Sequence, residues 1–346
     1  MIENNEKFED DQELFEHHKF VVDKGQNPLR IDKFLMSRLE NSSRNKIQNA
    51  AIAGSILVNN SAVRSSYKVK PDDVVTIVLS HPVREFELVA EDIPLDILYE
   101  DEDLIVINKE AGMVVHPAYA NYTGTLVNAL MFHFRKTGVA YDEKTGPYLV
   151  HRIDKNTSGV MLVAKTELAQ TRLGKQFFDH SISRKYNALV WGDLKDDEGT
   201  ITGNIGRSPK DRRVFTVYEE EDRGKHAVTH YKIIERLGYT SFIECQLETG
   251  RTHQIRVHMR HIGHTIFSDE TYGGNQILKG TTFTKYKQFV SNCFKICPRQ
   301  ALHAKSLGFI HPITKKEMYF ESPLPEDMSQ LIEKWRKYAT HKLIGG

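Results

Sequence analysis

The chain has 346 residues, of which 40% are apolar and 27% charged, a composition typical of a globular protein with about two domains. The formal net charge is only +1, so overall charge does not indicate a nucleic-acid partner. No apolar run approaches the ~20 residues of a membrane span, and the acidic N-terminus lacks a signal-peptide pattern. Three cysteines are too few for a disulfide framework, so we expect a cytoplasmic protein without a membrane partner.

The first segment, residues 1–19, carries seven acidic residues and two lysines among scattered apolar ones. Such a composition cannot bury enough apolar surface to offset the entropy of ordering the chain. We therefore expect a flexible acidic tail exposed to solvent.

Residues 20–80 have the pattern of a small α/β domain. Leu29, Ile31 and Phe34 recur at helical spacing, and Ser43 is placed to cap a second helix. Residues 56–58 and 74–78 are predicted strands, the first followed by an Asn-Asn turn. Eight basic and four acidic residues between residues 29 and 77 favour contact with phosphates, although a basic face is often only solvated.

This segment resembles the RNA-binding domain first described in ribosomal protein S4. The matching stretches are residues 30–35, 43–44, 54–59 and 72–73. The resemblance implies that phosphates of RNA are bound by Arg30, Arg44, Lys46 and Lys68.

Residues 81–96 contain two prolines and alternating charges, which predicts a linker. We expect a larger domain over residues 97–340, with an α+β fold in which helices and loops flank a mixed, mainly antiparallel sheet. It begins with a buried strand at residues 104–107 and a polar segment at residues 108–117. A helix capped by Thr123 or Thr125 follows.

Residues 151–159 place an imidazole, a guanidinium, a carboxylate, two hydroxyls and a glycine in one short loop. The loop runs into a short apolar stretch at residues 160–164, a predicted buried strand that would hold a catalytic carboxylate still. The same residues also suit an ordinary turn, in which Asp154 accepts hydrogen bonds from nearby amides and Gly159 has a positive φ. These residues alone leave both interpretations open.

Beyond this loop, a helix is predicted at residues 166–178 and a strand at residues 183–192, which contains Tyr186. A tyrosine on a strand is more often an ordinary core residue than a ligand contact. Two more strands are expected at residues 227–234 and 241–247.

A turn at Gly250 is expected to open a helix that carries arginines and histidines. The N-terminus of a helix favours anions, so a phosphate or carboxylate near Arg251 is physically sensible. Residues 275–299, rich in lysine and aromatics, are predicted to be an inserted loop, followed by a strand at 301–309 and a closing helix at 326–340.

A zinc cluster is the alternative for the histidines of this region. Four histidines and two cysteines could be drawn as ligands, but their spacing fits neither of the common zinc motifs and arginines lie between them. We therefore expect no metal. The residues considered are His253, His258, His261, His264, Cys293 and Cys297.

Three motifs together resemble the RluA family of RNA pseudouridine synthases. Residues 151–159 follow its His-Arg-Leu-Asp signature, and residues 249–258 match its Thr-Gly-Arg-Thr-His-Gln-Ile-Arg-Val-His motif. Residues 108–117 match a third motif, except that Glu110 stands where the family has proline. The resemblance extends over about residues 29–325, with the motifs in family order.

The resemblance implies isomerisation of uridine to pseudouridine in structured RNA, with large-subunit ribosomal RNA as the expected target. This reaction is expected to need no cofactor. Asp154 would be the catalytic aspartate, Tyr186 would stack on the target uracil, and Arg256 would pair with Asp154 and keep it ionised. Arg152 would displace the target base. The other residues expected to bind substrate are His151, Arg251, His253, Gln254, Asn108, Lys109 and His116.

Two other functions are compatible with parts of the chain. A non-catalytic RNA-binding factor for ribosome assembly would need only the N-terminal domain, and the intact catalytic set argues against it. A glycosidase that releases uracil would require a second carboxylate and an activated water. We also expect a monomer, possible partners being ribosomal RNA or a ribosomal precursor particle.

Overall fold

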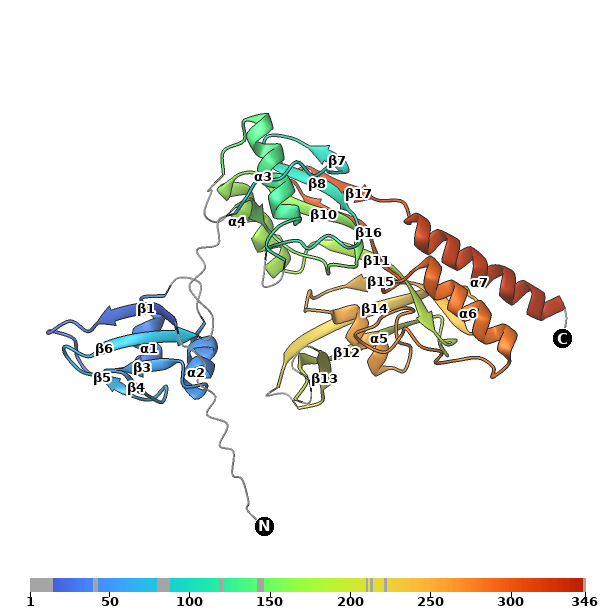
Figure 1. The fold of residues 1–346 in the computed structure, drawn as a ribbon. Helices are drawn as coiled ribbons and strands as arrows, with labels where there is room; N and C mark the ends of the chain where they lie inside the picture. The colour runs from blue at the N-terminus through green and yellow to red at the C-terminus, as the bar shows by residue number, and fades with distance from the viewer. Residues whose placement is uncertain are drawn as a thin grey trace, which may run out of the picture. The chain divides into compact units, whose positions relative to one another are not determined.

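The computed structural model describes residues 15–39, 43–79, 88–117, 121–141, 146–209, 211, 214–220 and 223–344. The chain forms two compact units, residues 1–86 and residues 87–346, each with its own core (Figure 1). Within the described ranges, no helix is both long and apolar enough to cross a membrane.

The first unit is a four-stranded sheet in the order β1-β6-β3-β4 with two helices and a short β2–β5 pair. Its centre is apolar, with Ile31, Phe34, Ile56 and Val75 fully buried. The β3–β4 hairpin turns through two asparagines with positive φ, as the Asn-Asn turn predicts. The elements are β1 (Phe15–Val21), β2 (Leu29–Arg30), α1 (Ile31–Met36), α2 (Arg44–Ile52), β3 (Ile56–Val58), β4 (Ser61–Ala62), β5 (Lys68–Val69) and β6 (Val74–Leu79).

Strand β1 corrects the expected boundary of the acidic tail. The tail was predicted to extend to residue 19, but residues 15–21 pair antiparallel with β6, from Phe15 opposite Leu79 to Val21 opposite Val74. The backbone pairing and the packing of Phe20 against the core of the unit outweigh the charged composition. Residues 1–14 lie outside the described ranges.

In the described part of the second unit, the strands form an 11-stranded sheet in the order β13-β12-β14-β15-β11-β16-β10-β8-β7, with β17 on β16 and β9 on β10. All of these pairs are antiparallel except β10 with β16, which confirms the predicted α+β fold. The strands are β7 (Ile97–Glu100), β8 (Leu104–Lys109), β9 (Tyr148–Leu149), β10 (Ser158–Ala164), β11 (Ser183–Trp191), β12 (Glu198–Arg207), β13 (Phe215–Tyr218), β14 (Lys225–Arg236), β15 (Thr240–Leu247), β16 (Leu302–Ile310) and β17 (Glu317–Glu321).

Five helices of the second unit lie against this sheet or against one another in the described ranges (Figure 1). Helix α4 packs on β10, α5 packs on β12, β13 and β14, and α6 packs on α7. Thr125 caps α3 with a capping box, and Thr166 caps α4. The helices are α3 (Leu126–Thr137), α4 (Glu167–Phe178), α5 (Gln254–His261), α6 (Thr284–Ile296) and α7 (Glu326–Ile344).

Two expected boundaries in this unit are wrong. Residues 81–96 were predicted to be a linker, but Val89 and Glu91 are tied to α3: the carbonyl of Val89 accepts from Asn128 Nδ2 at 2.7 Å, and the Glu91 amide donates to the Asn128 carbonyl at 3.0 Å. The buried amide of Asn128 needs these partners, so the larger unit begins before residue 97. Residues 81–87 lie outside the described ranges, and α7 extends to Ile344 rather than ending at residue 340.

The predicted inserted loop at residues 275–299 is also wrong, because 13 of its residues form α6. Tyr286, Val290 and Cys293 are buried and follow one another at helical spacing. All three belong to the main core, where Tyr286 contacts Trp335 of α7. The exposed lysines of the helix, Lys285, Lys287 and Lys295, hide this pattern in the sequence.

The fold places the 151–157 loop at the middle of the sheet. The loop leads directly into β10, a strand that is buried along its whole length. Strand β10 runs parallel to β16, with Ser158 opposite His303 and Gly159 opposite Ala304. On the far side of β16, Tyr186 of β11 pairs with the same Ala304. Two segments far apart in the sequence are thereby held two strands apart.

We expect Gly159→Ala to destabilise the second unit by about 3 kcal/mol or more. Gly159 has φ +115°, and a Cβ there would lie 2.1 Å from the Ala304 carbonyl oxygen. Urea unfolding followed by tryptophan fluorescence measures this unit alone, because both tryptophans, Trp191 and Trp335, are buried in it. Gly174→Ala is the control: this helical glycine has open space around it, so alanine should leave stability unchanged or raise it. An unaffected Gly159→Ala would contradict the close approach of β10 and β16.

Candidate active site

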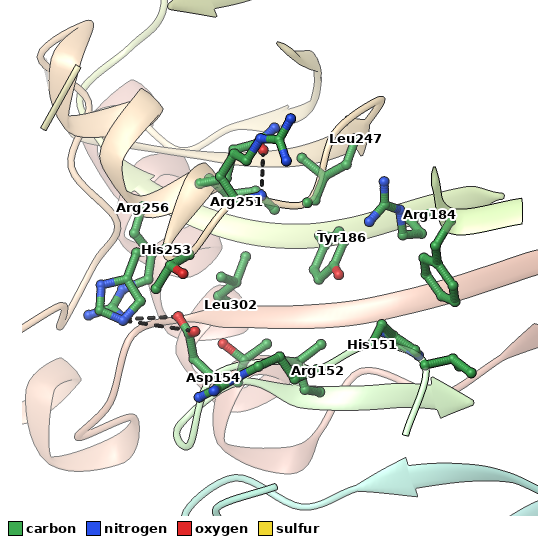
Figure 2. Close-up of a pocket in the computed structure, with 18 of the residues that line it drawn as sticks. His151, Arg152, Asp154, Arg184, Tyr186, Leu247, Arg251, His253, Arg256 and Leu302 are labelled. Atoms are coloured by element: carbon green, nitrogen blue, oxygen red, sulfur yellow. Dashed lines mark hydrogen bonds and ion pairs between the residues drawn. The ribbon is translucent and has the colours of Figure 1, made fainter. Parts of the chain in front are cut away.

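A cavity of about 480 Å³ opens in the second unit where three segments of the chain meet. The loop before β10 supplies Arg152 and Asp154, β11 supplies Tyr186, and the turn into α5 supplies Arg251 and the first residues of the helix (Figure 2). Its size is within the range of about 300–1,000 Å³ that is usual for ligand pockets. The sheet thus brings two of the three sequence motifs and Tyr186 together.

The centre of the cavity is an ion pair between Asp154 and Arg256. Arg256 Nη1 donates to Asp154 Oδ2 at 2.9 Å, and the Asp154 side chain is 22% exposed and so remains open to a ligand. On its other side, the buried guanidinium donates Nε and Nη2 to the two oxygens of Asp269 at 2.7 and 2.9 Å. Burial alone would lower the pKa of Arg256, but the hydrogen bonds with Asp269 and the charge of Asp154 raise it above its ordinary value. Arg256 is therefore a fixed cation that orients Asp154.

His253 lies beside this pair in a strained backbone conformation. It precedes α5 with φ 56°, a left-handed conformation that is uncommon outside glycine. Its Nδ1 lies 2.9 Å from the hydroxyl of Tyr272, and its Nε2 lies 3.9 Å from Asp154 Oδ1. The Tyr272 oxygen also accepts from the Phe215 amide, which fixes the phenol beside the imidazole. Burial lowers the pKa of His253, which favours the neutral imidazole.

Tyr186 forms one wall of the cavity. Its side chain is only 9% exposed and lies on a central strand, so the ring is held rigidly. Burial raises the pKa of its hydroxyl, which keeps the side chain neutral. A fixed aromatic face inside a cavity is suited to stacking on a planar ligand.

A family model described as RNA pseudouridylate synthase matches residues 103–261, and an S4 domain model matches residues 29–75. A Chlorobaculum parvum protein named as an uncharacterized RNA pseudouridine synthase is 47% identical over 321 residues, which cover 92% of this chain and 98% of the relative. The chain belongs to the RluA-type family of RNA pseudouridine synthases. It is therefore an enzyme that isomerises uridine in RNA.

One more sequence relative and one solved structure are similar to this synthase. A Zymomonas mobilis protein named ribosomal large subunit pseudouridine synthase D is 42% identical, over 88% of this chain and 93% of the relative. Among solved structures, the synthase resembles human RNA pseudouridylate synthase domain containing 4, with a TM-score of 0.55 and 23% identity over 70% of this chain and 93% of that one. At that identity the structural likeness shows a shared fold.

His151 of the synthase lines the cavity, but its ring is committed to the protein. Its Nε2 accepts a hydrogen bond from the Leu162 amide at 2.9 Å, and the ring stacks on Phe177 at 4.7 Å. Burial lowers the pKa of His151 to about 3, and the charge of Arg184 adds to this effect. A neutral imidazole that accepts from the backbone holds the loop in place. Its neighbour Arg152 is exposed at the mouth and stays available to RNA.

Gln254 was expected to bind substrate, and it lines the cavity, but its side chain is hydrogen-bonded within the protein. Its oxygen accepts from the Thr249 hydroxyl at 2.7 Å and from the Arg251 amide at 3.0 Å. Its nitrogen donates to the Val228 carbonyl and to the Thr229 hydroxyl. All the usual hydrogen bonds of an amide are used, so Gln254 positions the turn before α5. Arg251 lines the cavity, with its Nε bound to a backbone carbonyl.

The motif at residues 108–117 also does not reach the cavity as expected. Asn108 donates to Asp96 at 2.8 Å, and the exposed His116 has its Nδ1 at 2.9 Å from a neighbouring carbonyl. Lys109 is 2% exposed and donates to three backbone carbonyls, including that of Lys155 at 3.1 Å. None of the three motif residues lines the cavity. Lys109 instead supports the 151–157 loop through its hydrogen bond to the Lys155 carbonyl.

Sequence reasoning missed a second cation that supports this loop. Arg299, at the end of the predicted insertion, donates to the Asn156 carbonyl at 2.9 Å and holds Asp327 of α7 with two hydrogen bonds of 2.7 and 2.9 Å. Asp269, Tyr272 and Arg184, which also belong to the site, were missed as well. Arg184 lies two residues before Tyr186 in the predicted strand, but no role was assigned to it, and Asp269 and Tyr272 lie outside the three motifs.

In the first unit, Asp32 gathers two of the four residues expected to bind RNA. Its buried carboxylate accepts from Arg30 at 2.9 and 3.1 Å and from Arg44 at 3.1 Å. The hydrogen bond from Arg30 is the main reason that the pKa of Asp32 lies far below its usual range. Lys68 is exposed on β5, and Lys46 lies in α2, its side chain outside the described part. Whether these residues contact RNA stays a prediction.

The described residues bring together one group of possible metal ligands, Asp101, Asp103 and His311. Asp101 already accepts from the Tyr99 hydroxyl, from His311 Nε2 and from two backbone amides. The carboxylate therefore acts as an internal hydrogen-bond acceptor. The histidines and cysteines considered for zinc form no such group among the described residues.

We expect the second unit to lose stability as the pH falls below 6.5. Burial lowers the pKa of His151 to about 3 and that of His258 and His303 to about 4 from an ordinary 6.5. The unfolded chain takes up protons on these groups below 6.5, while the folded chain does so only at lower pH, so stability is present above 6.5 and lost below it. Each histidine should contribute about 2 kcal/mol of loss between pH 7 and pH 5. Urea midpoints from tryptophan fluorescence measure this. His258→Gln should show a smaller dependence, and equal midpoints at pH 7 and pH 5 in the native chain would contradict the prediction.

Proposed function

We propose that this synthase converts specific uridines of large-subunit ribosomal RNA to pseudouridine, by flipping the target base into the cavity and by using Asp154 as the essential group. The observation that carries the proposal is the chain of charges from Asp154 through Arg256 to Asp269 beside the fixed ring of Tyr186. Relatives with 42% identity are named for large-subunit ribosomal RNA, which supports the choice of RNA. We expect it to act in the cytoplasm as a monomer.

The charge of the cavity fits this substrate. Four arginines line it, together with one carboxylate, that of Asp154. An excess of guanidinium groups favours the phosphates around a flipped nucleotide. A hydrolase acting on the same bond would require a second carboxylate to activate water, and the described residues that line the cavity include none besides Asp154. The geometry therefore favours isomerisation over release of uracil.

The reaction divides among the residues as follows. A base inside a helix hides its sugar, so the uridine must leave its stack before the bond between uracil and ribose can be attacked. Arg152, exposed at the mouth, can fill the gap, while Tyr186 stacks on the flipped base. Asp154 then acts at the sugar, either as nucleophile or as the anion and base that support a glycal path. On either path the Asp154 carboxylate must be aimed at the sugar, and its hydrogen bond from Arg256 Nη1 holds it in place.

The experiment measures tritium released from carbon 5 of labelled uridine in large-subunit ribosomal RNA incubated with the purified chain. Pseudouridine mapping in cells with and without the gene identifies the position. Release from this RNA and loss of a mapped site in the deletion strain are expected. Release from transfer RNA but none from ribosomal RNA would overturn the proposed target.

We expect Lys68→Ala to weaken RNA binding without slowing turnover of bound RNA. Lys68 is exposed in the first unit, and loss of one phosphate contact should lower the slope of log affinity against log salt by about one. Binding across a salt series and single-turnover rates at saturating enzyme measure the two effects. Lys175→Ala, an exposed lysine of α4 paired with Asp179 at 2.6 Å, is the control. An unchanged salt slope for Lys68→Ala would exclude this contact.

A further inference from the structure

Arg184 lies in the same cavity as Asp154, at the other side of Tyr186. It precedes Tyr186 by two residues on β11, so both side chains project from the same face of the strand. Figure 2 shows Tyr186 between Asp154 and Arg184, and both charges act on the Tyr186 hydroxyl. A planar group stacked on Tyr186 with one edge at Asp154 would therefore extend toward Arg184.

Arg184 is a buried cation with no carboxylate partner among the described residues. Its side chain is 7% exposed, and Nη2 donates to the Glu248 carbonyl at 3.0 Å. Its Nε is buried and has no acceptor among the described residues. The other buried arginines of the unit differ, since Arg256 is bound to Asp269 and Arg299 to Asp327. A buried guanidinium with unused donors is unfavourable until an acceptor arrives.

Among the described residues no anion neutralises this guanidinium. A Cβ at Gly250 would lie 2.6 Å from Arg184 Nη1, so the guanidinium packs directly against the Gly250 backbone. Burial lowers the pKa of Arg184, and the charge of Arg251 acts in the same direction. An acceptor on a ligand bound in the cavity would offset this cost.

We propose that Arg184 donates hydrogen bonds to a carbonyl oxygen of the flipped uracil and stabilises the negative charge that this base acquires when its bond to ribose breaks. The inference rests on the proposed function, which places uracil on Tyr186 and the sugar at Asp154. When the bond between N1 and the sugar breaks, its electron pair leaves with uracil, and the charge spreads to the two carbonyl oxygens. A fixed donor in a water-poor cavity stabilises such charge more in the transition state than in the ground state.

The rest of the reaction leaves Arg184 unchanged. Carbon 5 of the rotated uracil forms the new bond to the sugar, its proton is lost, and N1 takes up a proton. Atoms and electrons balance, since the product is an isomer of the substrate. Arg184 holds the base as an anion between the two steps, which also keeps it from leaving the cavity.

The test compares Arg184→Met and Arg184→Lys with Lys185→Met. Lys185 is the neighbouring cation of the same strand, projects from the opposite face and pairs with Glu244 at 2.9 Å, so it is a matched control. We expect Arg184→Met to lower the single-turnover rate of tritium release about 10²–10³-fold, with RNA affinity nearly unchanged. Arg184→Lys should recover part of the rate, and Lys185→Met should retain it.

Stability separates this effect from a folding defect. Methionine removes an uncompensated buried charge, so the urea midpoint of Arg184→Met should match that of the native chain or exceed it. If the urea midpoint of Arg184→Met falls below the native one, the test rests on Arg184→Lys. A lowered single-turnover rate in Arg184→Lys at a native urea midpoint supports the proposal.

Two results would overturn the proposal. One is an unchanged rate in both variants, and the other is a loss confined to RNA affinity with a shallower salt dependence, which would assign Arg184 to a backbone phosphate. Failure of the proposed function can be told apart from failure of the Arg184 proposal, because in the first case the native chain itself would release no tritium.

Discussion

Asp154→Asn should abolish pseudouridine formation while RNA binding persists. The substitution keeps the size of the side chain and an oxygen that can still accept from Arg256 Nη1, now at 2.9 Å from the carboxylate. It removes the charge, which both the nucleophilic and the glycal path require. We expect the rate to fall by at least about 10⁴-fold, as for the loss of other catalytic groups of this kind. Single-turnover tritium release measures the rate, and filter binding measures the affinity for the same RNA.

The control for this variant is Asp179→Asn, which neutralises an exposed carboxylate paired with Lys175 on the surface. Exposed pairs contribute little, so rate and stability should match the native chain. Undiminished release from Asp154→Asn would remove Asp154 from the chemistry. A loss of RNA binding equal to the loss of rate would instead make Asp154 a binding residue.

The sequence allowed the centre of the site to be predicted because its residues stand in long motifs. Asp154 and Arg256 are 102 residues apart, yet their predicted pairing is present in the structure. Motifs do not distinguish residues that touch a ligand from residues that hold a loop. Lys109 and Gln254 were expected to contact substrate because they stand in the motifs, and both have their hydrogen bonds inside the protein.

The residues that sequence reasoning missed have the opposite character. Asp269 lies outside the motifs, and its contact with Arg256 depends on the turn after α5. Arg184 precedes Tyr186 by two residues, but the sequence does not show that its side chain lines the cavity. The same limit applies to the fold. The apolar positions of α6 were obscured by lysines, and β12 alternates too weakly between buried and exposed residues to have been predicted. Buried, strongly apolar elements such as β8 and β10 were predicted correctly.

Asp269→Asn should destabilise the second unit by about 3–5 kcal/mol, the usual loss when one partner of a buried ion pair is removed. Asp269 is 1% exposed and binds Arg256 Nε and Nη2 through both oxygens. An asparagine offers one oxygen and turns an amide toward the guanidinium, so one donor of Arg256 loses its acceptor. Of its two carboxylate partners, the buried cation then keeps only Asp154. Urea unfolding followed by tryptophan fluorescence measures the loss.

Asp327→Asn provides a matched control for this variant. Asp327 binds Arg299 with the same two distances of 2.7 and 2.9 Å, but its side chain is 28% exposed, so water can replace part of the interaction. We expect a clearly smaller loss there, of about 1–2 kcal/mol. Equal losses in the two variants would show that burial of the Asp269 pair contributes nothing beyond its geometry.

The Asp269→Asn variant also tests how Asp154 is positioned. With Asp269 neutralised, Arg256 can rotate toward Asp154 and form a two-bond pair with it, which would hold the catalytic carboxylate away from the sugar. The single-turnover rate of Asp269→Asn should therefore fall at temperatures where the unit is still folded, while RNA affinity stays near native. A native rate in the folded variant would mean that Arg256 needs no second carboxylate to orient Asp154, and Asp269 would then serve stability alone.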